Sequence, residues 1–587
     1  FRRVLFRSVW TKCLAAKRNV DIEERGTTMN EGLNRRSFLK GALVSGVSLA
    51  AASFVGCSPN DGNQSTKQPT SEETGFIGDF LAEDFENSSV AIDPITDISE
   101  EKTYDIVVVG AGTSGLPAVL TALEEGASVA CLQKESKAIS QGSGAGGLLI
   151  DESTPFGIHR FMQKYRELCE YRVNDELLST YAYHSGEAIM WMAKMANEAG
   201  YPNAKNSKSV FEYEENSHVT KIMNDAAIKP ESNQNLFEAL SAYAESKGAE
   251  FFYNTPGIQL ATEGNRVTAV IGKSGSDYIK FNAAKAVILA TGDYQNNDSI
   301  VERFSPDISR FSRKQSNKTG DGILMSALIG GHMCPVGHSR QMHDFDSGPM
   351  PEEPFLAVNE NGERFMNEEI PSTSAANVLR FQKADDPGKY SMIFDSNYEE
   401  QVASWGGRPA SLENLKKYVP GEVSDASGII ESLIDTHYAD TLDELAEKLG
   451  IPADNLKKSV DRYNKMVAQG FDEDFGKLPK YLKPIDTPPY WGRHRWIRIT
   501  ATCCGVAVNG NYQVLNQDNE PFDGLYAVGF GAGDLCGGAD WSIYWTGMSC
   551  GSCMTSGRVA ASHALTGILE PSHPITWDAM KDIYAGS

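Results

Sequence analysis

Apolar residues along this chain form a few short runs and several longer segments with helical spacing. Residues 104–109 and 128–132 are largely apolar, which is typical of short strands buried on both faces. The stretch between them, which ends at Gly126, has the pattern of a helix. Further elements are expected as a buried strand at 287–290 and as helical segments at 161–200 and 546–565. The order of strand, helix and strand predicts an α/β fold.

A glycine-rich loop directly follows the first strand. Gly110 permits the tight turn, Gly112 lets the backbone approach a pyrophosphate, and Gly115 lets the following helix pack on the strand. The N-terminus of that helix attracts anionic phosphates. The loop therefore predicts a Rossmann-type dinucleotide site with contacts from Gly110, Gly112, Thr113, Ser114 and Gly115.

The end of the second strand departs from the usual dinucleotide-binding pattern. An Asp or Glu there normally binds the ribose hydroxyls, but this chain has Gln133, followed by Lys134 and Glu135. A Gln amide can bond a hydroxyl without the added strength of a charge, so Glu135 is the residue expected to help. A dinucleotide buried along its whole length, such as FAD, tolerates this change better than a dissociating nicotinamide.

Size and charge narrow the choice of partners. A chain of 587 residues is too long for one hydrophobic core, which indicates two or three packed units. The whole chain has a formal charge of -24, and residues 1–57 hold ten Lys and Arg against four Asp and Glu, so residues 58–587 carry -30. A surface this acidic repels phosphate backbones and anionic headgroups. Nucleic acid is therefore not an expected partner.

The first residues have the features of a leader and an export signal. Residues 1–28 are expected to be non-native, because residues 1–8 back-translate to what looks like a sequencing adapter and Met29 opens a more coherent frame; an unusual basic leader is the alternative. Residues 29–57 combine Arg35-Arg36 with an apolar stretch of about fifteen residues, which is too short to span a membrane. This segment resembles a Tat signal, and a short buried helix is the alternative.

Cys57 ends this signal in a sequence similar to a bacterial lipobox. The cysteine would become the lipid-modified first residue of a mature chain on the outer face of the cytoplasmic membrane, while cleavage after Ala52 without a lipid stays open. Residues 58–102 are polar, have little apolar periodicity and are expected to form a flexible tether. We therefore expect an extracytoplasmic protein that meets the membrane only through Cys57.

Six motifs in sequence resemble those of one flavoprotein family. They are the loop at 110–115, Gly144-Ala145-Gly146-Gly147, the strand end at 287–292, Thr319-Gly320-Asp321, the run 361–368, and the segment 524–538. Over residues 103–570 their order resembles the flavoprotein subunits of fumarate reductases and succinate dehydrogenases, especially the exported reductases and the related 3-ketosteroid dehydrogenases. The resemblance implies an FAD-dependent oxidoreductase that acts on CH–CH or C=C groups.

The resemblance also implies an architecture. A discontinuous Rossmann-type FAD-binding domain would take residues 103–336 and 491–570, an inserted α+β capping domain 337–490, and a tail 571–587. Substrates usually bind in clefts between such domains. Asp534 would bind the ribityl chain, and the helix at 546–565 would aim its positive N-terminal dipole at the flavin. Further FAD contacts are expected at Gln133, Lys134, Gly146, Gly147, Ile258, Ala290, Thr291, Gly292, Asp321 and Ser549.

The expected active site departs from the dicarboxylate reductases of this family. Their arginine proton donor corresponds to Ser372, and their carboxylate-binding His and Arg correspond to Thr500 and Tyr544. One substrate-side His is kept as His343. Because Arg forks bind carboxylates in a bidentate way, their loss makes a dicarboxylate such as fumarate a poor substrate.

Aromatic residues are expected around the lost arginines. A Tyr hydroxyl near a flavin can polarise a carbonyl or deliver a proton, and Trp walls suit a flat ligand, although core packing is the alternative for each aromatic residue. The residues concerned are Trp541, Tyr544, Trp545 and Tyr294. Arg340, with His338 and His343 close in sequence, is a candidate proton relay or anion anchor, or part of a hydrated hinge. The catalytic candidates are thus Tyr544, Tyr294, His343 and Arg340.

The cysteines and the source of electrons leave further choices open. Cys503-Cys504, Cys536 and the pair Cys550 and Cys553 are expected to be free thiols or a disulfide, because their spacing is not typical of an iron–sulfur cluster, and no metal is expected. No CxxCH haem motif occurs, so a separate electron donor, either a cytochrome or a quinol-linked protein, is inferred by family analogy. Three functions compete: reduction of an activated C=C bond in anaerobic respiration, 3-ketosteroid desaturation, and FAD binding without catalysis.

Overall fold

The structure is a computed structural model that describes most of the chain after residue 75. The described residues are 76–585 except 141–143, 202–209, 224–232, 315–316, 344–348, 351–352, 372–373, 423–433, 534, 539, 542–544 and 546. The expected leader, the export signal with Cys57 and the first part of the tether lie outside them.

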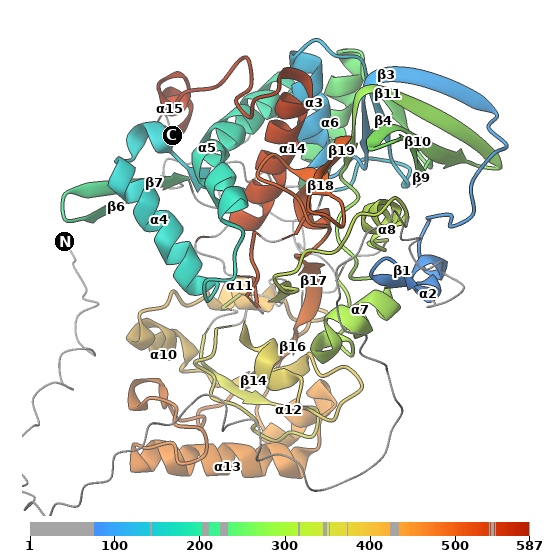
Figure 1. Cartoon of the computed structure of the whole chain (residues 1–587). Helices are drawn as coiled ribbons and strands as arrows, with labels where there is room; N and C mark the ends of the chain where they lie inside the picture. Colours follow the sequence, from blue (N-terminus) through green and yellow to red (C-terminus); the bar gives the residue numbers. More distant parts are fainter. Residues whose placement is uncertain are drawn as a thin grey trace, which may run out of the picture. The chain divides into compact units, whose positions relative to one another are not determined.

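An eight-stranded sheet forms the centre of the cofactor-binding part (Figure 1). Its strand order is β18-β19-β10-β11-β3-β4-β8, with β9 paired to β10. The pairs β19 with β11, β11 with β3, β3 with β4 and β4 with β8 are parallel. The bounds are β3 Glu100–Val109, β4 Val129–Leu132, β8 Glu250–Phe252, β9 Gly257–Glu263, β10 Arg266–Ser274, β11 Asp277–Leu289, β18 Gln513–Leu515 and β19 Pro521–Ala527. This parallel core confirms the predicted Rossmann-type α/β fold.

Helices from distant parts of the sequence pack around this sheet. Helix α14 (Met548–Thr566) contacts both α3 (Gly115–Glu124) and α5 (Asp175–Glu198), and Figure 1 shows the three side by side. The C-terminal segment therefore completes the domain that begins at β3, which confirms that the FAD domain is discontinuous. The other helices of this part are α4 Pro155–Leu168, α6 Asn233–Ser246, α7 Asp298–Phe304, α8 Asp321–Leu328 and α15 Trp577–Ala585.

Three smaller sheets flank the cofactor-binding part. The first has the order β5-β7-β6, the second pairs β12 with β17, and the third pairs β1 with β2. Their bounds are β5 Gly147–Leu148, β6 Val210–Glu215, β7 His218–Met223, β12 Arg340–His343, β17 Arg498–Thr502, β1 Phe76–Ile77 and β2 Phe80–Leu81, which α2 (Ala82–Glu86) follows.

A second sheet with its own core forms the predicted α+β cap. It is antiparallel, with the order β13-β14-β16-β15. Leu445 and Leu456, from two helices, join Ile393 of the sheet in one buried cluster. The bounds are β13 Leu356–Val358, β14 Lys389–Phe394, β15 Thr436–Ala439, β16 Tyr490–Trp496, α9 Ala376–Leu379, α10 Tyr398–Trp405, α11 Leu412–Lys416, α12 Leu442–Leu449 and α13 Ala453–Gln469.

Two expected boundaries differ from the structure. The FAD domain was expected to resume at residue 491, but this residue lies inside β16. That strand pairs with β14 and β15, so it belongs to the cap sheet. Residues 76–102 were expected to be tether, yet they contain β1, β2, α2 and the start of β3. Phe80 and Phe85 are buried in the main core, which holds this stretch on the domain. The sequence analysis missed these elements because the segment is mostly polar and contains only a few apolar residues that pack on the core.

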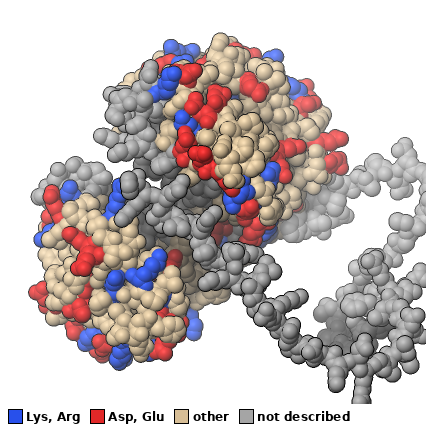
Figure 2. Space-filling view, turned by 90° about the vertical axis from the view of Figure 1, so that its left-hand side faces the viewer, with Lys and Arg blue, Asp and Glu red and all other residues tan. Residues whose placement is uncertain are grey.

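The surface carries charges of both signs. Figure 2 shows Asp and Glu spread over the visible face and interspersed with Lys and Arg, without a large basic patch on that face. Among the described residues, no helix has the length and apolar character required to cross a membrane.

Candidate active site

The loop between β3 and α3 fits the backbone of a bound pyrophosphate. Gly110 has a φ of +109°, and a Cβ there would lie 2.4 Å from the carbonyl oxygen of Ala290. A Cβ on Gly115 would lie 1.8 Å from the carbonyl oxygen of Gly110. Only glycine fits either position, so the loop stays tight and α3 begins against the end of the strands. This arrangement leaves the first amides of α3 for anionic phosphates.

One cavity beside this loop collects the predicted nucleotide contacts. Seven of them line it: Gly110, Gly112, Gln133, Lys134, Ala290, Thr291 and Asp321. Four more of the expected contacts lie next to these in the chain or on adjoining elements. Thr113 and Ser114 lead into α3, Gly292 follows Thr291 with a φ of +79°, and the buried Ile258 follows Gly257, which lines the cavity.

Polar partners position the residues at the ribose end. The Lys134 Nζ lies 3.2 Å from Asp321 Oδ2 and 3.2 Å from Thr319 Oγ1. The Gln133 amide donates to the Lys137 carbonyl at 2.9 Å, so its oxygen is the group left for a hydroxyl. Glu135 accepts from the Asn317 amide and also lines the cavity.

Sequence reasoning did not include several lining residues of this cavity. Asn317 and Lys318 directly precede the Thr319-Gly320-Asp321 motif, so the motif could have been extended backward to find them. Pro256 and Gly257 also line the cavity, at the start of β9. No familiar motif marks those two residues.

The N-terminal part of α14 lies against the second glycine loop, and the middle of α14 lies against the start of α3. The Gly146 amide donates to the Gly547 carbonyl at 3.0 Å. A Cβ on Gly551 would lie 2.0 Å from the Gly146 carbonyl oxygen, and a Cβ on Gly557 would lie 2.0 Å from that of Ser114. These contacts bring Gly146, Gly147 and Ser549 of the first turn together with the dinucleotide loop, so two positive helix ends serve one elongated anion.

A second cavity continues from this junction toward the aromatic residues. It is lined by Leu177, Cys503, Tyr512, Gly529, Phe530, Ala532, Gly533, Leu535, Trp541, Ser552 and Ser556. The Trp541 indole Nε1 is buried and has no hydrogen-bond partner among the described residues. An orphaned buried donor of this kind fits a polar edge of a bound cofactor or substrate. The glycine cradle, the two helix ends and this donor all fit FAD.

The aromatic residues near α14 form a packed wall. The Trp545 ring lies 4.7 Å from Phe161 and 6.4 Å from Tyr181, measured between ring centroids. Phe530 meets Trp541 edge to face at 5.4 Å. Because Phe161, Trp541 and Trp545 belong to one buried cluster, part of their role is core packing, which the sequence analysis had left open.

The structure places the Tyr294 and His338 side chains together, and neither residue lines the two cavities above. The Tyr294 hydroxyl and His338 Nδ1 are 2.7 Å apart, and the Tyr294 ring is fully buried against Phe304. Burial raises the pKa of the Tyr294 phenol well above its usual value. These contacts favour a packing role for Tyr294 over the expected catalytic one.

Arg340 is already paired with carboxylates. It forms ion pairs with Asp307 at 2.5 Å and with Asp540 at 3.4 Å, and its side chain is 6% exposed. A guanidinium neutralised in this way is poorly suited to anchor a substrate anion, because a second anion would have to compete with two fixed ones. The pairing favours a structural role linking β12 to the neighbouring loops.

Several predicted residues cannot be placed relative to these contacts. His343 is the last residue of β12, where its backbone lies opposite Arg498, and its side chain is outside the described residues. Tyr544, Asp534 and Ser372 also lie outside them. Thr500 is described, and its hydroxyl donates to the Gln341 carbonyl at 2.9 Å.

The described cysteines are all buried. They are Cys131, Cys169, Cys334, Cys503, Cys504, Cys536, Cys550 and Cys553. Burial raises the pKa of the Cys553 thiol to about 12 and that of Cys503 well above its usual value. Protonated buried thiols are inert as nucleophiles and ligands.

These features define a class of protein. The Rossmann-type sheet, the glycine cradle and the second helix N-terminus form an FAD site, and a separate cap lies next to it in the chain. The FAD binding domain family matches residues 105–542, and the chain belongs to this family.

Three similar proteins specify the type of chemistry. A vinyl phenol reductase of Lactiplantibacillus plantarum is 26% identical over 505 residues, which are 80% of this chain and 97% of that protein. A 3-oxosteroid 1-dehydrogenase of Mycobacterium tuberculosis is 28% identical over 318 residues, which are 48% of this chain and 53% of that one. The open form of a flavocytochrome c3 fumarate reductase shares the fold, with a TM-score of 0.62 at 23% identity over 81% of this chain and 79% of that one. The chain is an FAD-dependent oxidoreductase of CH–CH or C=C groups.

Proposed function

We propose that this flavoprotein reduces an activated C=C bond of an organic acceptor that is not a dicarboxylate, such as an aromatic enoate, a polyphenol or an enone. Thr500 carries the proposal. It stands where the family's dicarboxylate reductases place a carboxylate-binding His, and its hydroxyl is engaged by the Gln341 carbonyl at 2.9 Å. Neither this side chain nor the neutralised Arg340 offers a charge for a second carboxylate.

The aromatic residues around the second cavity favour an acceptor with a flat ring. Phe530 and Trp541 line it, and two of its polar groups are the Trp541 indole N–H and the Ser552 hydroxyl. Few polar groups on aromatic walls are typical of sites for ring-shaped ligands. The similarity to a vinyl phenol reductase points in the same direction.

The chain's own residues have three tasks in this reaction. Bound FAD supplies the hydride. The two glycine loops and the N-termini of α3 and α14 fix the cofactor, the aromatic walls exclude water, and a side chain must deliver the proton that completes reduction of the double bond. Tyr544 remains the proposed proton donor because it occupies the position of a lost arginine.

We propose further that the enzyme works outside the cytoplasm. The twin arginines at 35 and 36 and the lipobox-like Cys57 support Tat export and a lipid anchor. A separate cytochrome or quinol-linked protein would supply electrons, because the sequence contains no CxxCH motif for a haem of its own. The organic acceptor would then serve anaerobic respiration.

A desaturating 3-ketosteroid dehydrogenase is the second candidate. The 28% identity to a 3-oxosteroid 1-dehydrogenase over 318 residues favours it. The two functions differ in direction, since a desaturase removes hydrogen from a saturated ketone.

One anaerobic assay separates the candidates. Purified holoenzyme is mixed with reduced viologen and a panel of hydroxycinnamates, vinyl phenols, polyphenols, enones and fumarate. We expect rapid viologen oxidation with at least one aromatic or enone acceptor and little with fumarate. Comparable rates with fumarate would contradict the proposal, and reduction of an oxidised dye by a saturated 3-ketosteroid would establish the desaturase instead.

A further inference from the structure

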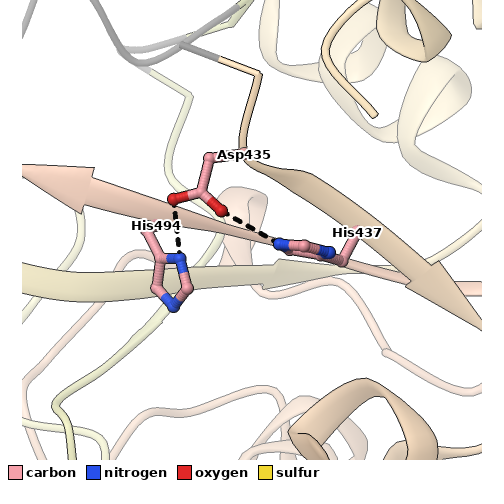
Figure 3. Close-up of side chains that lie close together, drawn as sticks. All are labelled: Asp435, His437 and His494. Carbon is pink, nitrogen blue, oxygen red and sulfur yellow. Dashed lines mark hydrogen bonds and ion pairs between the residues drawn. The ribbon is translucent and has the colours of Figure 1, made fainter. Parts of the chain in front are cut away.

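Three chemically distinctive side chains meet on the cap sheet, outside the cofactor site. Asp435, His437 and His494 lie close together in Figure 3. Each offers one ligand atom, and these atoms all lie within 4.8 Å of one another. The sequence analysis expected no metal and did not single out these residues.

The register of two antiparallel strands brings the three side chains to one face. His437 of β15 lies opposite Gly492 of β16, and Thr436 lies opposite Arg493. The same register places Asp435 opposite His494. Because residues two apart on a strand point to the same side, Asp435, His437 and His494 share one face. A Cβ on Gly492, opposite His437, would lie 2.6 Å from Leu449 Cδ1, so the glycine lets α12 pack closely against this face.

Both imidazoles point a ring nitrogen at the same carboxylate. The Asp435 Oδ1 is 2.9 Å from His437 Nε2, and Asp435 Oδ2 is 2.8 Å from His494 Nδ1. The other nitrogen of His494, Nε2, is 2.9 Å from the Leu449 carbonyl oxygen. A carbonyl can only accept, so that Nε2 carries a proton and Nδ1 is the only other ring nitrogen that faces the carboxylate.

A ring nitrogen that faces a carboxylate oxygen at such a distance requires a cation between the two atoms. Either protons or one metal ion satisfy this need, and a metal ion satisfies all three groups at once. Second-sphere donation from a ligating imidazole to a backbone carbonyl is the usual arrangement at protein metal sites. Leu449 is also the last residue of α12, and the negative end of a helix favours a cation.

We propose that Asp435, His437 and His494 form a Zn²⁺ site that joins β15 to β16. Two neutral imidazoles and one carboxylate suit Zn²⁺ better than Ca²⁺ or Mg²⁺, which prefer oxygen ligands. Tetrahedral bonds of about 2.0–2.1 Å separate ligand atoms by about 3.3 Å, so the observed spacing needs shifts of roughly half an ångström. Side-chain exposures of 17% for His437, 43% for Asp435 and 39% for His494 let water complete the coordination.

The ion would act as a cross-link in the cap. Strand β15 is the edge strand of the sheet order β13-β14-β16-β15 and pairs only with β16 there. Two ligands from the β15 segment and one from β16 fix this edge, and the Leu449 contact ties α12 to it. Lys389 of β14 opposes the site with its positive charge, which limits the affinity without blocking the ligands.

The test uses the full-length holoenzyme purified without a polyhistidine tag. Protein stripped with chelator and dialysed is titrated with Zn²⁺, the bound metal is counted by mass spectrometry, and Co²⁺ is used as a second probe through its ligand-field bands. We expect about one Zn²⁺ per chain, a raised Tm and tetrahedral Co²⁺ bands. His437→Ala and His494→Ala should weaken Zn²⁺ binding at least about tenfold and lose the Tm response, while the FAD content stays unchanged.

His573→Ala is the matched control, because His573 is an exposed histidine far from the three ligands in sequence. This variant should still bind about one Zn²⁺ per chain. If the alanine variants do not fold, Asp435→Asn keeps the shape of the side chain and must also lose at least about tenfold in affinity. Wild-type uptake no better than that of His437→Ala, or a folded Asp435→Asn with wild-type affinity, overturns the site.

Discussion

At the scale of single residues, Gly110 lets β3, α3 and a pyrophosphate approach one another closely because it has no side chain. Gly110→Ala should place a methyl group 2.4 Å from the Ala290 carbonyl oxygen at a φ of +109°. Strain of about 1–3 kcal/mol in the loop should weaken FAD binding by about 5- to 150-fold. The ratio of flavin to protein absorbance, and its recovery on adding FAD, measures this.

Gly264→Ala is the control for backbone strain alone. Gly264 also has a positive φ, of +62°, but a Cβ there meets nothing within 4 Å. Its FAD content should equal that of the wild type. Equal FAD content in Gly110→Ala would show that the loop does not contact the cofactor.

Tyr544 is the residue on which the proposed proton delivery depends. Tyr544→Phe should lower kcat by about 10²- to 10⁴-fold, the usual contribution of a general acid, while FAD content stays at the wild-type level. Stopped-flow turnover with the best acceptor from the viologen panel measures the loss. Full turnover would reduce Tyr544 to a packing residue and move the search to His343.

Tyr294→Phe removes the hydroxyl of a second tyrosine, one that the structure describes, and serves as a comparison with Tyr544→Phe. Its hydroxyl bonds His338 inside the core at 2.7 Å, so we expect loss of about 1–3 kcal/mol of stability with little change in kcat. A large fall in kcat without loss of stability would return Tyr294 to the list of proton donors.

At the scale of elements, Arg558 joins three helices of the FAD domain. Its guanidinium in α14 bonds Glu187 of α5 at 2.8 and 2.7 Å and Glu124 of α3 at 3.1 Å, and it lies 3.9 Å from the Trp191 ring centre. The side chain has no exposed surface. The cofactor loops rest on these same helices, so their packing sets the geometry of the site.

Arg558→Met should destabilise the fold by about 3–5 kcal/mol, because it leaves two largely buried carboxylates without a counter-charge. Adding Glu187→Gln should recover part of the lost Tm, which calorimetry measures. Arg462→Met, which removes an exposed ion pair with Asp474, should leave the Tm unchanged. A Tm of Arg558→Met equal to that of the wild type would contradict the role of the cluster.

The central elements could be predicted because their physics is local. Parallel strands buried on both faces, such as β3 and β11, appear as apolar runs, and α14 (Met548–Thr566) matches the helix expected at 546–565. The edge strand β15 gave no such signal. Asp435 and His494 are 59 positions apart, so only strand register brings them together.

The same difference between local sequence and distant contacts applies to the residues of the candidate site. The cofactor contacts are expected from glycine geometry, and seven of the expected residues line one cavity. The roles of Tyr294 and Arg340 cannot be assigned from the sequence, because an aromatic residue in a core and an ion-paired arginine have the same sequence signature as catalytic ones. Only the contacts to His338 and Asp307 separate the two cases.

At the scale of the whole molecule, the net charge bears on how the proposed export signal would hold the chain at a membrane. Beyond residue 57 the chain carries a formal charge of -30, which weakens direct association with anionic headgroups. A lasting hold on a membrane would then need a covalent anchor, and Cys57 is the residue proposed for it. The Tat route carries folded proteins, which suits the proposed export of a chain that binds FAD.

Export and anchoring can be tested separately in cells that express the chain from Met29. Changing Arg35 and Arg36 together to Lys should hold the precursor in the cytoplasm, because the twin arginines address it to the Tat machinery. Cys57→Ser should still be exported, but it should move from the membrane fraction to the soluble extracytoplasmic fraction, since two acyl chains are lost. Ser58→Ala, next to the modified residue, should fractionate like the wild type. Membrane fractionation of Cys57→Ser equal to that of the wild type would remove the lipid anchor and leave export alone, whereas export of the double Lys variant at the wild-type level would remove the Tat route.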